Sequence, residues 1–280
     1  MDKVKKLVNA NWVYKAGYSG RNVCIALLDT GVAEHIELQN RIVFFKDYVN
    51  NRKRQYDDNG HGTHIAGIIC GKNCGMAPQA TLIGFKILDD KGSGKTVNAI
   101  KALEWIYAHH KEYHIRILNF SMGYIANASV GLQQQLLDML DELWDAGVVV
   151  VTAAGNNGPE ENSVTVPGIS RKVITVGENN TSYGGRGPTS CCIVKPEILA
   201  PGTDVLSLSN VGNGYVRKSG TSMAAPVVSG ALALAIEKRP EIKPVELKLF
   251  LYDTVFREPE NIKKNKSWGV LDVDNLVKML

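Results

Sequence analysis

The sequence alternates short apolar runs with longer segments of helical periodicity. The run at 23–28 is apolar on both faces, which is typical of a strand buried in a parallel sheet. The same pattern predicts further strands at 81–88, 115–120, 148–153 and 173–176, and helices at 61–70, 97–110, 132–146, 221–238 and 244–253. Repeated strand–helix–strand units place parallel strands in one sheet, with helices on both faces. We therefore expect an α/β fold of three layers around a mostly parallel central sheet.

The 280 residues, 44% of them apolar, are enough for one large core. No linker, low-complexity tract or internal repeat divides the chain, so we expect a single domain over residues 1–280, with 1–7 as a short N-terminal extension. The net charge is +4, and the basic cluster at 52–54 is too short for a nucleic-acid patch. The apolar run at 223–236 contains Pro226 and falls short of the ~20 residues that span a bilayer. We expect neither nucleic acid nor membrane as a partner.

The five cysteines form a poor disulfide framework, because their number is odd and Cys191 and Cys192 are adjacent. Their spacing does not fit a zinc ribbon. The basic N-terminus is followed by no apolar segment of the kind found in secretory signals before Asn9. Reduced thiols and a cytoplasmic location are the expectation.

In parallel sheets of this kind, sites form at the carboxyl ends of the strands. Asp29 comes directly after the first buried strand, where a carboxylate is poorly placed unless it is paired. The alternative is a turn-forming aspartate.

His61 begins an expected helix and is bracketed by Gly60 and Gly62, which permit the close approach of another backbone. A metal site is the alternative, because His61 and His64 are three residues apart on this helix. No carboxylate stands nearby in a ligand pattern, and we expect no metal here.

Ser222 follows a glycine-led turn into the apolar helix at 221–238. It could merely cap that helix. A serine in this position also has the positive end of the helix dipole and free backbone N–H groups beside it, and these can stabilise an oxyanion.

Together, these three residues match one mechanism. A serine nucleophile needs a base to accept its proton, and the base needs an acid that fixes its tautomer and stabilises the imidazolium. The chain order Asp, His, Ser is one of the known orders of this constellation, and subtilisin is its type example.

The motifs around these residues resemble those of the subtilisin-like serine proteases. The matching segments are 28–31, 61–67, 153–158, 195–202, 220–226 and 268–273, and the resemblance covers about residues 8–280. It implies a serine endopeptidase of three-layer subtilisin-like fold that needs no cofactor.

The resemblance assigns a role to each matching catalytic position. Ser222 would attack the scissile carbonyl, His61 would act as general base and then general acid, and Asp29 would orient His61. Asn156 would donate its side-chain amide to the oxyanion, together with the backbone N–H of Ser222. A plain turn residue is the alternative for Asn156, because the local sequence is Asn-Asn-Gly.

The resemblance also implies that a peptide or protein substrate binds as an extended strand between two segments. For the first segment, Gly92–Gly94, a flexible loop is the alternative. A third segment, 164–168, resembles a wall and floor of the pocket for the residue before the cleaved bond. Because neither Thr165 nor Asn157 is acidic, we expect apolar or mid-sized residues there rather than Lys or Arg. The substrate-binding residues implied are Gly92, Ser93, Gly94, Ser121, Met122, Gly123 and Thr165.

The chain departs from secreted family members in two respects. The family match starts almost at once, which leaves no room for a large prodomain, so the alternatives are an intracellular enzyme or a secreted one lacking its signal and prodomain. The loop that holds a tight calcium ion in secreted relatives is shortened to residues 71–75. We do not assign that calcium site, although calcium elsewhere stays possible.

Three other classes of protein are alternatives to a subtilisin-like protease. A non-catalytic relative would usually have a broken triad, whereas all four catalytic positions are filled here. A peptide ligase would use the same acyl-enzyme but exclude water. A lipase of the α/β-hydrolase type needs Gly-x-Ser-x-Gly and the order Ser, Asp, His, which this chain lacks.

Overall fold

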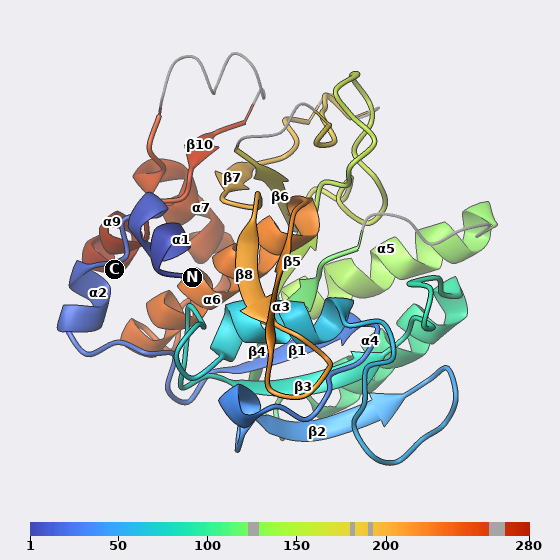
Figure 1. Ribbon diagram of the computed structural model, residues 1–280. Coiled ribbons are helices and arrows are strands. Elements are labelled where there is room, and N and C mark those ends of the chain that lie inside the picture. Colours follow the sequence, from blue (N-terminus) through green and yellow to red (C-terminus); the bar gives the residue numbers. More distant parts are fainter. Residues whose placement is uncertain (123–128, 180–182, 190–192, 258–266) are drawn as a thin grey trace.

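A computed structural model describes residues 1–122, 129–179, 183–189, 193–257 and 267–280. Its centre is an eight-stranded sheet of order β10-β7-β6-β5-β4-β1-β3-β2, in which every neighbouring pair is parallel (Figure 1). The strands are β1 (Cys24–Asp29), β2 (Ile42–Asp47), β3 (Thr81–Lys86), β4 (Ile115–Phe120), β5 (Val149–Ala153), β6 (Ile174–Glu178), β7 (Ile198–Ala200) and β10 (Gly269–Val270). β1, β5 and β6 are buried along their whole length, as expected for parallel strands covered on both faces.

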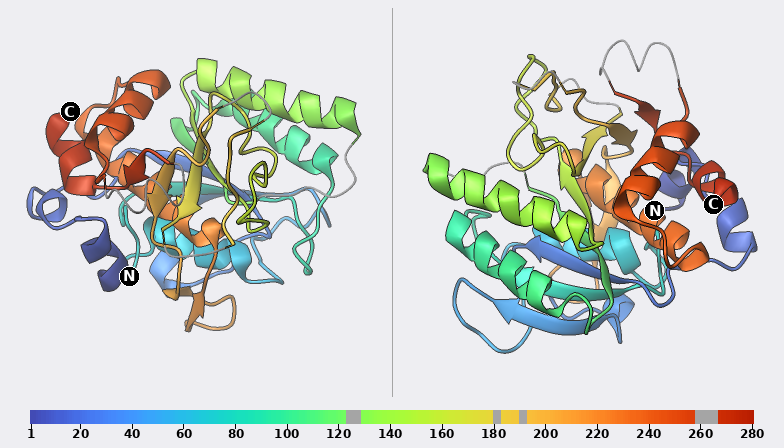
Figure 2. Two further views of the ribbon diagram at one scale, coloured as in Figure 1. Left: turned by 90° about the horizontal axis from the view of Figure 1, so that it is seen from above. Right: turned by 180° about the vertical axis from the view of Figure 1, so that it is seen from behind.

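Helices cover both faces of the sheet. Figure 2 shows α4 (Thr96–His109) and α5 (Val130–Asp145) on one face, and α3 (His61–Cys70) and α6 (Thr221–Lys238) on the other. α6 is buried over nearly its whole length and contacts β4, β5, β6 and β7. The three-layer α/β fold predicted from the sequence is confirmed.

A short hairpin and several smaller helices complete the fold. β8 (Val205–Leu208) pairs antiparallel with β9 (Tyr215–Lys218), and β8 packs against α3. The smaller elements are α1 (Asp2–Leu7), α2 (Trp12–Lys15), the 3-10 helix η1 (Ile36–Leu38), α7 (Pro244–Thr254) and α9 (Val273–Met279).

The chain just after α1 is joined to the start of α9, because the backbone N–H of Val273 donates to the carbonyl of Val8 at 2.8 Å. Residues 1–7, predicted to be a short extension, form α1, and Val4 is buried in the same core as Val277. The carboxylate of Asp274 on α9 accepts hydrogen bonds from the backbone N–H groups of Trp12 and Val13, at 2.8 and 2.9 Å. The N-terminal helices are therefore tied to the C-terminal one.

The expected elements largely match those observed. α3, α6 and β4 begin and end at the predicted residues, and the other predicted elements differ from the observed ones by at most two residues at either end. The strand expected to reach residue 88 ends at Lys86, and Leu88 forms an isolated antiparallel bridge with Gly94. The sequence did not predict the following elements: α1, α2, η1, α9, β2, β7, β8, β9 and β10.

Candidate active site

The structure pairs Asp29 with His61. Asp29 ends β1 and is wholly buried, and His61 is the first residue of α3. Asp29 Oδ1 lies 2.7 Å from His61 Nδ1 and also accepts the Thr30 backbone N–H at 2.8 Å. An aspartate on Nδ1 fixes the tautomer that leaves Nε2 as a proton acceptor. The pairing is therefore the one that a general base requires.

A glycine allows the two elements to meet. A Cβ added to Gly62 would lie 2.1 Å from the carbonyl oxygen of Gly31 and 3.1 Å from the Asp29 side chain. Any larger residue would push α3 away from the end of β1. The close backbone approach predicted from the glycines around His61 is confirmed at Gly62.

The pKa of His61 is raised above its ordinary value. Burial opposes the charged ring, but the charge of Asp29 and its hydrogen bond favour the imidazolium more strongly. Asp57 raises the pKa further, whereas the cation of Lys218 lowers it. The side chain of His61 stays 24% exposed, so the ring remains accessible to a substrate.

Asp57, which the sequence did not single out, holds the start of α3 in place. Its Oδ1 accepts from the hydroxyl of Thr30 and from the backbone of Asn59 and Gly60, at 2.8, 3.1 and 2.8 Å. Its Oδ2 accepts from the backbone and hydroxyl of Thr63, at 2.8 and 2.7 Å. Five hydrogen bonds from both sides of His61 thus converge on one buried carboxylate. The available signal was an aspartate four residues before a histidine that begins a helix.

A buried lysine, Lys86, holds the backbone that follows Asp29. Lys86 ends β3 beside Asp29 in the sheet register and is wholly buried. Its Nζ donates to the carbonyl of Thr30 and to Asp58 Oδ1, each at 2.6 Å. The backbone after Asp29 is therefore held by a charge-assisted hydrogen bond.

Asn156 contacts the start of α6 at Thr221, the residue before Ser222. Ser222 is the second residue of α6 and is half-buried. Asn156 Oδ1 accepts from the backbone N–H and the hydroxyl of Thr221, at 3.1 and 3.2 Å. Because its oxygen is engaged with Thr221, Asn156 keeps its amide N–H groups available next to Ser222. No hydrogen bond joins Ser222 to the His61 ring in the part of the chain that the structure describes.

The predicted substrate-binding segments follow strands that neighbour the catalytic ones. β3 and β4 flank β1, so Gly92–Gly94 and Ser121 lie near the edge of the sheet that carries Asp29. Ser121 and Met122 are buried, and Gly123 lies outside the described residues.

Thr165 lies beside the strand end that leads to Asn156. Its backbone N–H donates to the carbonyl of Ala154 at 3.1 Å. A Cβ added to Gly155 would come within 2.5 Å of its hydroxyl. Thr165 therefore lies against Gly155, the residue before Asn156, as a residue of a pocket wall would. Its role in substrate binding stays a prediction.

His64 lies against backbone carbonyl groups of the β8–β9 hairpin. It is wholly buried, and its Nε2 lies 3.0 Å from the carbonyl of Val205 and 3.1 Å from that of Val216. Burial lowers its pKa to about 4, so the neutral ring donates to these carbonyls. In the described ranges, no group of three or more His, Cys, Asp or Glu residues could hold a metal ion.

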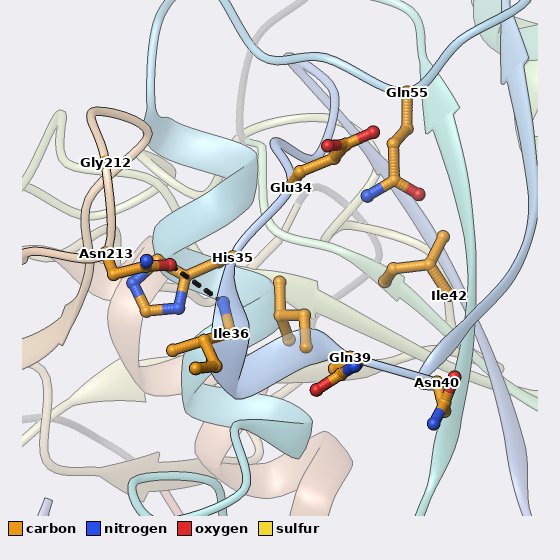
Figure 3. Close-up of a pocket in the computed structure, with 10 residues that line it drawn as sticks. Glu34, His35, Ile36, Gln39, Asn40, Ile42, Gln55, Gly212 and Asn213 are labelled. Atoms are coloured by element: carbon orange, nitrogen blue, oxygen red, sulfur yellow. Dashed lines mark hydrogen bonds between the residues drawn. The ribbon is translucent and has the colours of Figure 1, made fainter.

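A separate cavity of about 660 Å³ lies between η1 and the tip of the β8–β9 hairpin (Figure 3). In Figure 3, Asn213 of the hairpin lies next to Ile36, and its Oδ1 accepts the Ile36 backbone N–H at 2.9 Å. None of the predicted site residues lines this cavity.

None of the described helices is long and apolar enough to cross a membrane.

Comparisons with known proteins identify relatives of this chain. Serine protease AprX from Bacillus subtilis (strain 168) is 38% identical over 315 aligned positions, which cover 99% of this chain and 71% of that protein. Subtilisin DY from Bacillus licheniformis is 32% identical over 276 positions, covering 96% and 95% of the two chains. A crystal structure of a cold adapted subtilisin-like serine proteinase has a TM-score of 0.77 and 28% identity, covering 92% of this chain and 90% of the other.

Residues 20–275 match the subtilase family, which is most of the chain. The matched range includes Asp29, His61, Asn156 and Ser222. The chain therefore belongs to the subtilase family and is a subtilisin-like serine protease, a hydrolase of peptide bonds.

Proposed function

We propose that Ser222 is the nucleophile of this protease, that His61 is its general base and acid, and that Asp29 orients His61. Asn156 and the backbone N–H of Ser222 form the oxyanion hole. The observation that carries this assignment is the 2.7 Å contact between Asp29 and His61 at the carboxyl edge of the sheet. Asn156 follows β5 at this edge and accepts from Thr221, the residue before Ser222. The enzyme cleaves within peptide chains that it binds as extended strands.

The chemistry follows from these positions. His61 Nε2 takes the proton of the Ser222 hydroxyl as its oxygen attacks the carbonyl carbon, and Asp29 stabilises the resulting imidazolium. The tetrahedral oxyanion lies at the N-terminus of α6, where the Asn156 amide and the backbone donate to it. His61 then protonates the leaving amine, and water repeats the sequence on the acyl-enzyme.

Two variants test the assignment. Ser222→Ala should abolish labelling by a fluorophosphonate probe and reduce kcat by about 10⁶-fold, the magnitude established for subtilisin itself. Asn156→Leu should keep the labelling site but reduce kcat by about 10²–10³-fold, which is again subtilisin's own value. Labelling of the Ser222→Ala variant at full rate would refute the nucleophile assignment.

For specificity, we propose that Thr165 lines the pocket for the residue before the cleaved bond, and that Gly92–Gly94 and Ser121–Gly123 flank the bound peptide. Supporting this, Thr165 is half-buried beside Gly155, and its side chain is uncharged, not acidic. A peptide library should show apolar or mid-sized residues before the cleaved bond. Strict cleavage after Arg would contradict the proposal.

We propose that catalysis needs no cofactor and no tight calcium ion in the loop at 71–75. In that loop Asn73 is held by Glu37, whose carboxylate accepts from its backbone and side-chain amide at 2.7 and 2.5 Å. These protein donors occupy the carboxylate oxygens that a cation would need. Activity should survive a chelator, and its complete loss with recovery on adding calcium would overturn this.

We also propose that the enzyme works in the cytoplasm. In support, Cys24, Cys70 and Cys74 are free buried thiols, and burial raises the pKa of Cys24 and Cys74 to about 11. With such pKa values the thiols stay protonated and unreactive at neutral pH, and unpaired cysteines are typical of proteins from reducing compartments. Fractionation of the source cells, with an antibody against the chain, should place it with cytoplasmic markers, whereas recovery from the medium would support the secreted alternative.

A further inference from the structure

A buried polar network joins β4 to α6, where the helix packs on the sheet. The hydroxyl of Ser229 donates to Asn119 Oδ1 at 2.8 Å, and Asn119 Nδ2 donates to the hydroxyl of Ser121 at 2.5 Å. All three side chains are wholly buried. The mechanism proposed above gives no role to Asn119 or Ser229, so their presence in the core needs another explanation.

Stability alone does not account for this network. Ser229 is the one polar side chain between Met223 and Ile236 of α6, and Asn119 is flanked by apolar residues in β4. Removing amide and hydroxyl groups from water costs free energy, which their mutual hydrogen bonds largely offset. Apolar side chains of the same shape can therefore replace both partners with little change in the free energy of unfolding. The network fixes a geometry more than it stabilises the fold.

The network connects two segments of the proposed active site. Ser229 follows Ser222 by seven residues, which is almost two turns of α6, so both side chains lie along one side of this helix. Ser121 begins the segment that is predicted to flank the bound peptide. Asn119 thus bridges the helix that carries the proposed nucleophile and the segment that would hold its substrate.

Of these two segments, α6 is the one held by the rest of the fold. It is buried over nearly its whole length and packs on four strands, so the loss of one hydrogen bond should not displace it. Ser121, by contrast, lies just beyond Phe120, the last residue of β4 that pairs with β5. The side chain of Asn119 reaches past this point and binds Ser121. The position of Ser121 is therefore set from α6 through Asn119.

We propose that Asn119 is a positioning residue for substrate binding, which aligns Ser121 and Met122 with Ser222 through its hydrogen bond to Ser229 on α6. The inference rests on the proposed function, because it takes Ser222 as the nucleophile and Ser121 as part of the peptide-binding segment. Asn119 touches no substrate and takes no part in the proton transfers.

The test compares an extended peptide with an ester of a single amino acid, which is too short to lie along the segment at Ser121. Ser229→Ala should lower kcat/KM for the peptide about three- to tenfold, the range expected for one buried hydrogen bond. It should leave kcat/KM for the ester and the rate of fluorophosphonate labelling unchanged, because α6 stays in place.

Asn119→Leu removes both hydrogen bonds at similar volume and should show the same pattern. Because Ser229 has already lost its acceptor in this variant, adding Ser229→Ala should lower kcat/KM for the peptide no further. Losses that multiply in the double variant would show that the two residues act separately, and would overturn the inference.

Thr254→Ala is the matched control, because it removes the hydrogen bond of another buried hydroxyl, to the carbonyl of Phe250 at 2.6 Å, on a helix without proposed site residues. It should leave the ratio of peptide to ester cleavage unchanged. An unchanged ratio in Ser229→Ala would overturn the inference, and so would an equal loss on peptide, ester and labelling, since that loss would report damage to α6 itself. Failure of the proposed function would appear differently, as fluorophosphonate labelling that persists in Ser222→Ala.

Discussion

The carboxylate of Asp29 controls the pH at which His61 can act as a base. Burial alone would lower the pKa of His61, but the charge of Asp29 and its hydrogen bond together more than offset burial, so the pKa lies above its ordinary value of 6.5. The base must be neutral, so kcat/KM should rise with pH through this raised pKa and be lost below it. A pH profile on a neutral peptide should therefore have its acid midpoint above 6.5.

The variant Asp29→Asn separates this effect from general damage. It removes the charge while keeping the shape, so the acid midpoint should move down and kcat should fall by about 10⁴-fold. A midpoint that stays in place while kcat falls would mean that another group sets the pKa of His61.

Asp57 should matter for both stability and rate, although it does not touch the substrate in the proposed mechanism. Asp57→Asn replaces an acceptor by a donor that faces the N–H groups around it, and should lower the free energy of unfolding by about 2–4 kcal/mol. Because Asp57 also raises the pKa of His61, the acid midpoint of kcat/KM should shift down. Thermal unfolding and the pH profile measure the two effects.

A purely structural role for Asp57 would lower stability and leave the midpoint unchanged. Glu246→Gln is a suitable control, because this carboxylate also caps a helix start but lies on the surface at α7.

The hairpin β8–β9 depends on a neutral His64. The folded ring takes up a proton only near pH 4, whereas the unfolded ring does so near 6.5. Between these values the unfolded state binds more protons, so the free energy of unfolding should rise with pH. His64 should account for at most about 3 kcal/mol of that rise.

The measurement compares Ser222→Ala, which cannot digest itself, with Ser222→Ala/His64→Gln from pH 4 to 7. The glutamine amide can still donate to Val205 or Val216 but does not titrate in this range. Its variant should show a flatter slope, and an equal slope in both proteins would show that His64 is not the titrating group.

Elements with a strong pattern were predictable, and weakly patterned ones were not. α3 and α6 are buried on nearly every side, so their apolar content and glycine starts are plain in the sequence. β2 is an edge strand with mixed exposure, and β9 is exposed along most of its length. Such strands are defined by their partners and not by their own residues. α1 and α9 are short, and the residues that follow α1, Val8 and Asn9, accept hydrogen bonds from the backbone at the start of α9.

The catalytic residues could be predicted from the sequence, whereas the residues that hold them in place, Asp57 and Lys86, could not. Asp29, His61, Asn156 and Ser222 lie in long specific motifs, and the expected parallel sheet places Asp29 and Asn156 after the carboxyl ends of its strands. The contacts of Asp57 and Lys86 depend on how a loop folds back under α3, which no local pattern encodes.

On the β6–β7 side of the sheet, a buried charge cluster joins three parts of the molecule. Lys195 is wholly buried, and its Nζ donates to Glu197 Oε1 at 2.7 Å and to Thr175 Oγ1 at 2.9 Å. Lys248 of α7 reaches the same Glu197 oxygen at 2.8 Å. Burial lowers the pKa of Lys195 to about 8, against the opposing pull of Glu197. One carboxylate thus serves two cations between β6, β7 and α7.

Because Glu197 is shared by two lysines, replacing Glu197 should lower the free energy of unfolding more than replacing Lys195. Lys195→Met leaves Glu197 paired with Lys248, so the free energy of unfolding should fall by only about 1–3 kcal/mol. Glu197→Gln leaves two cations facing each other without a counter-charge, and should cost about 3–5 kcal/mol. Denaturant unfolding in the Ser222→Ala background measures both, and kcat in the active background should be unchanged. Equal losses in the two variants would mean that Lys248 does not compensate, and the cluster would then act as one isolated ion pair.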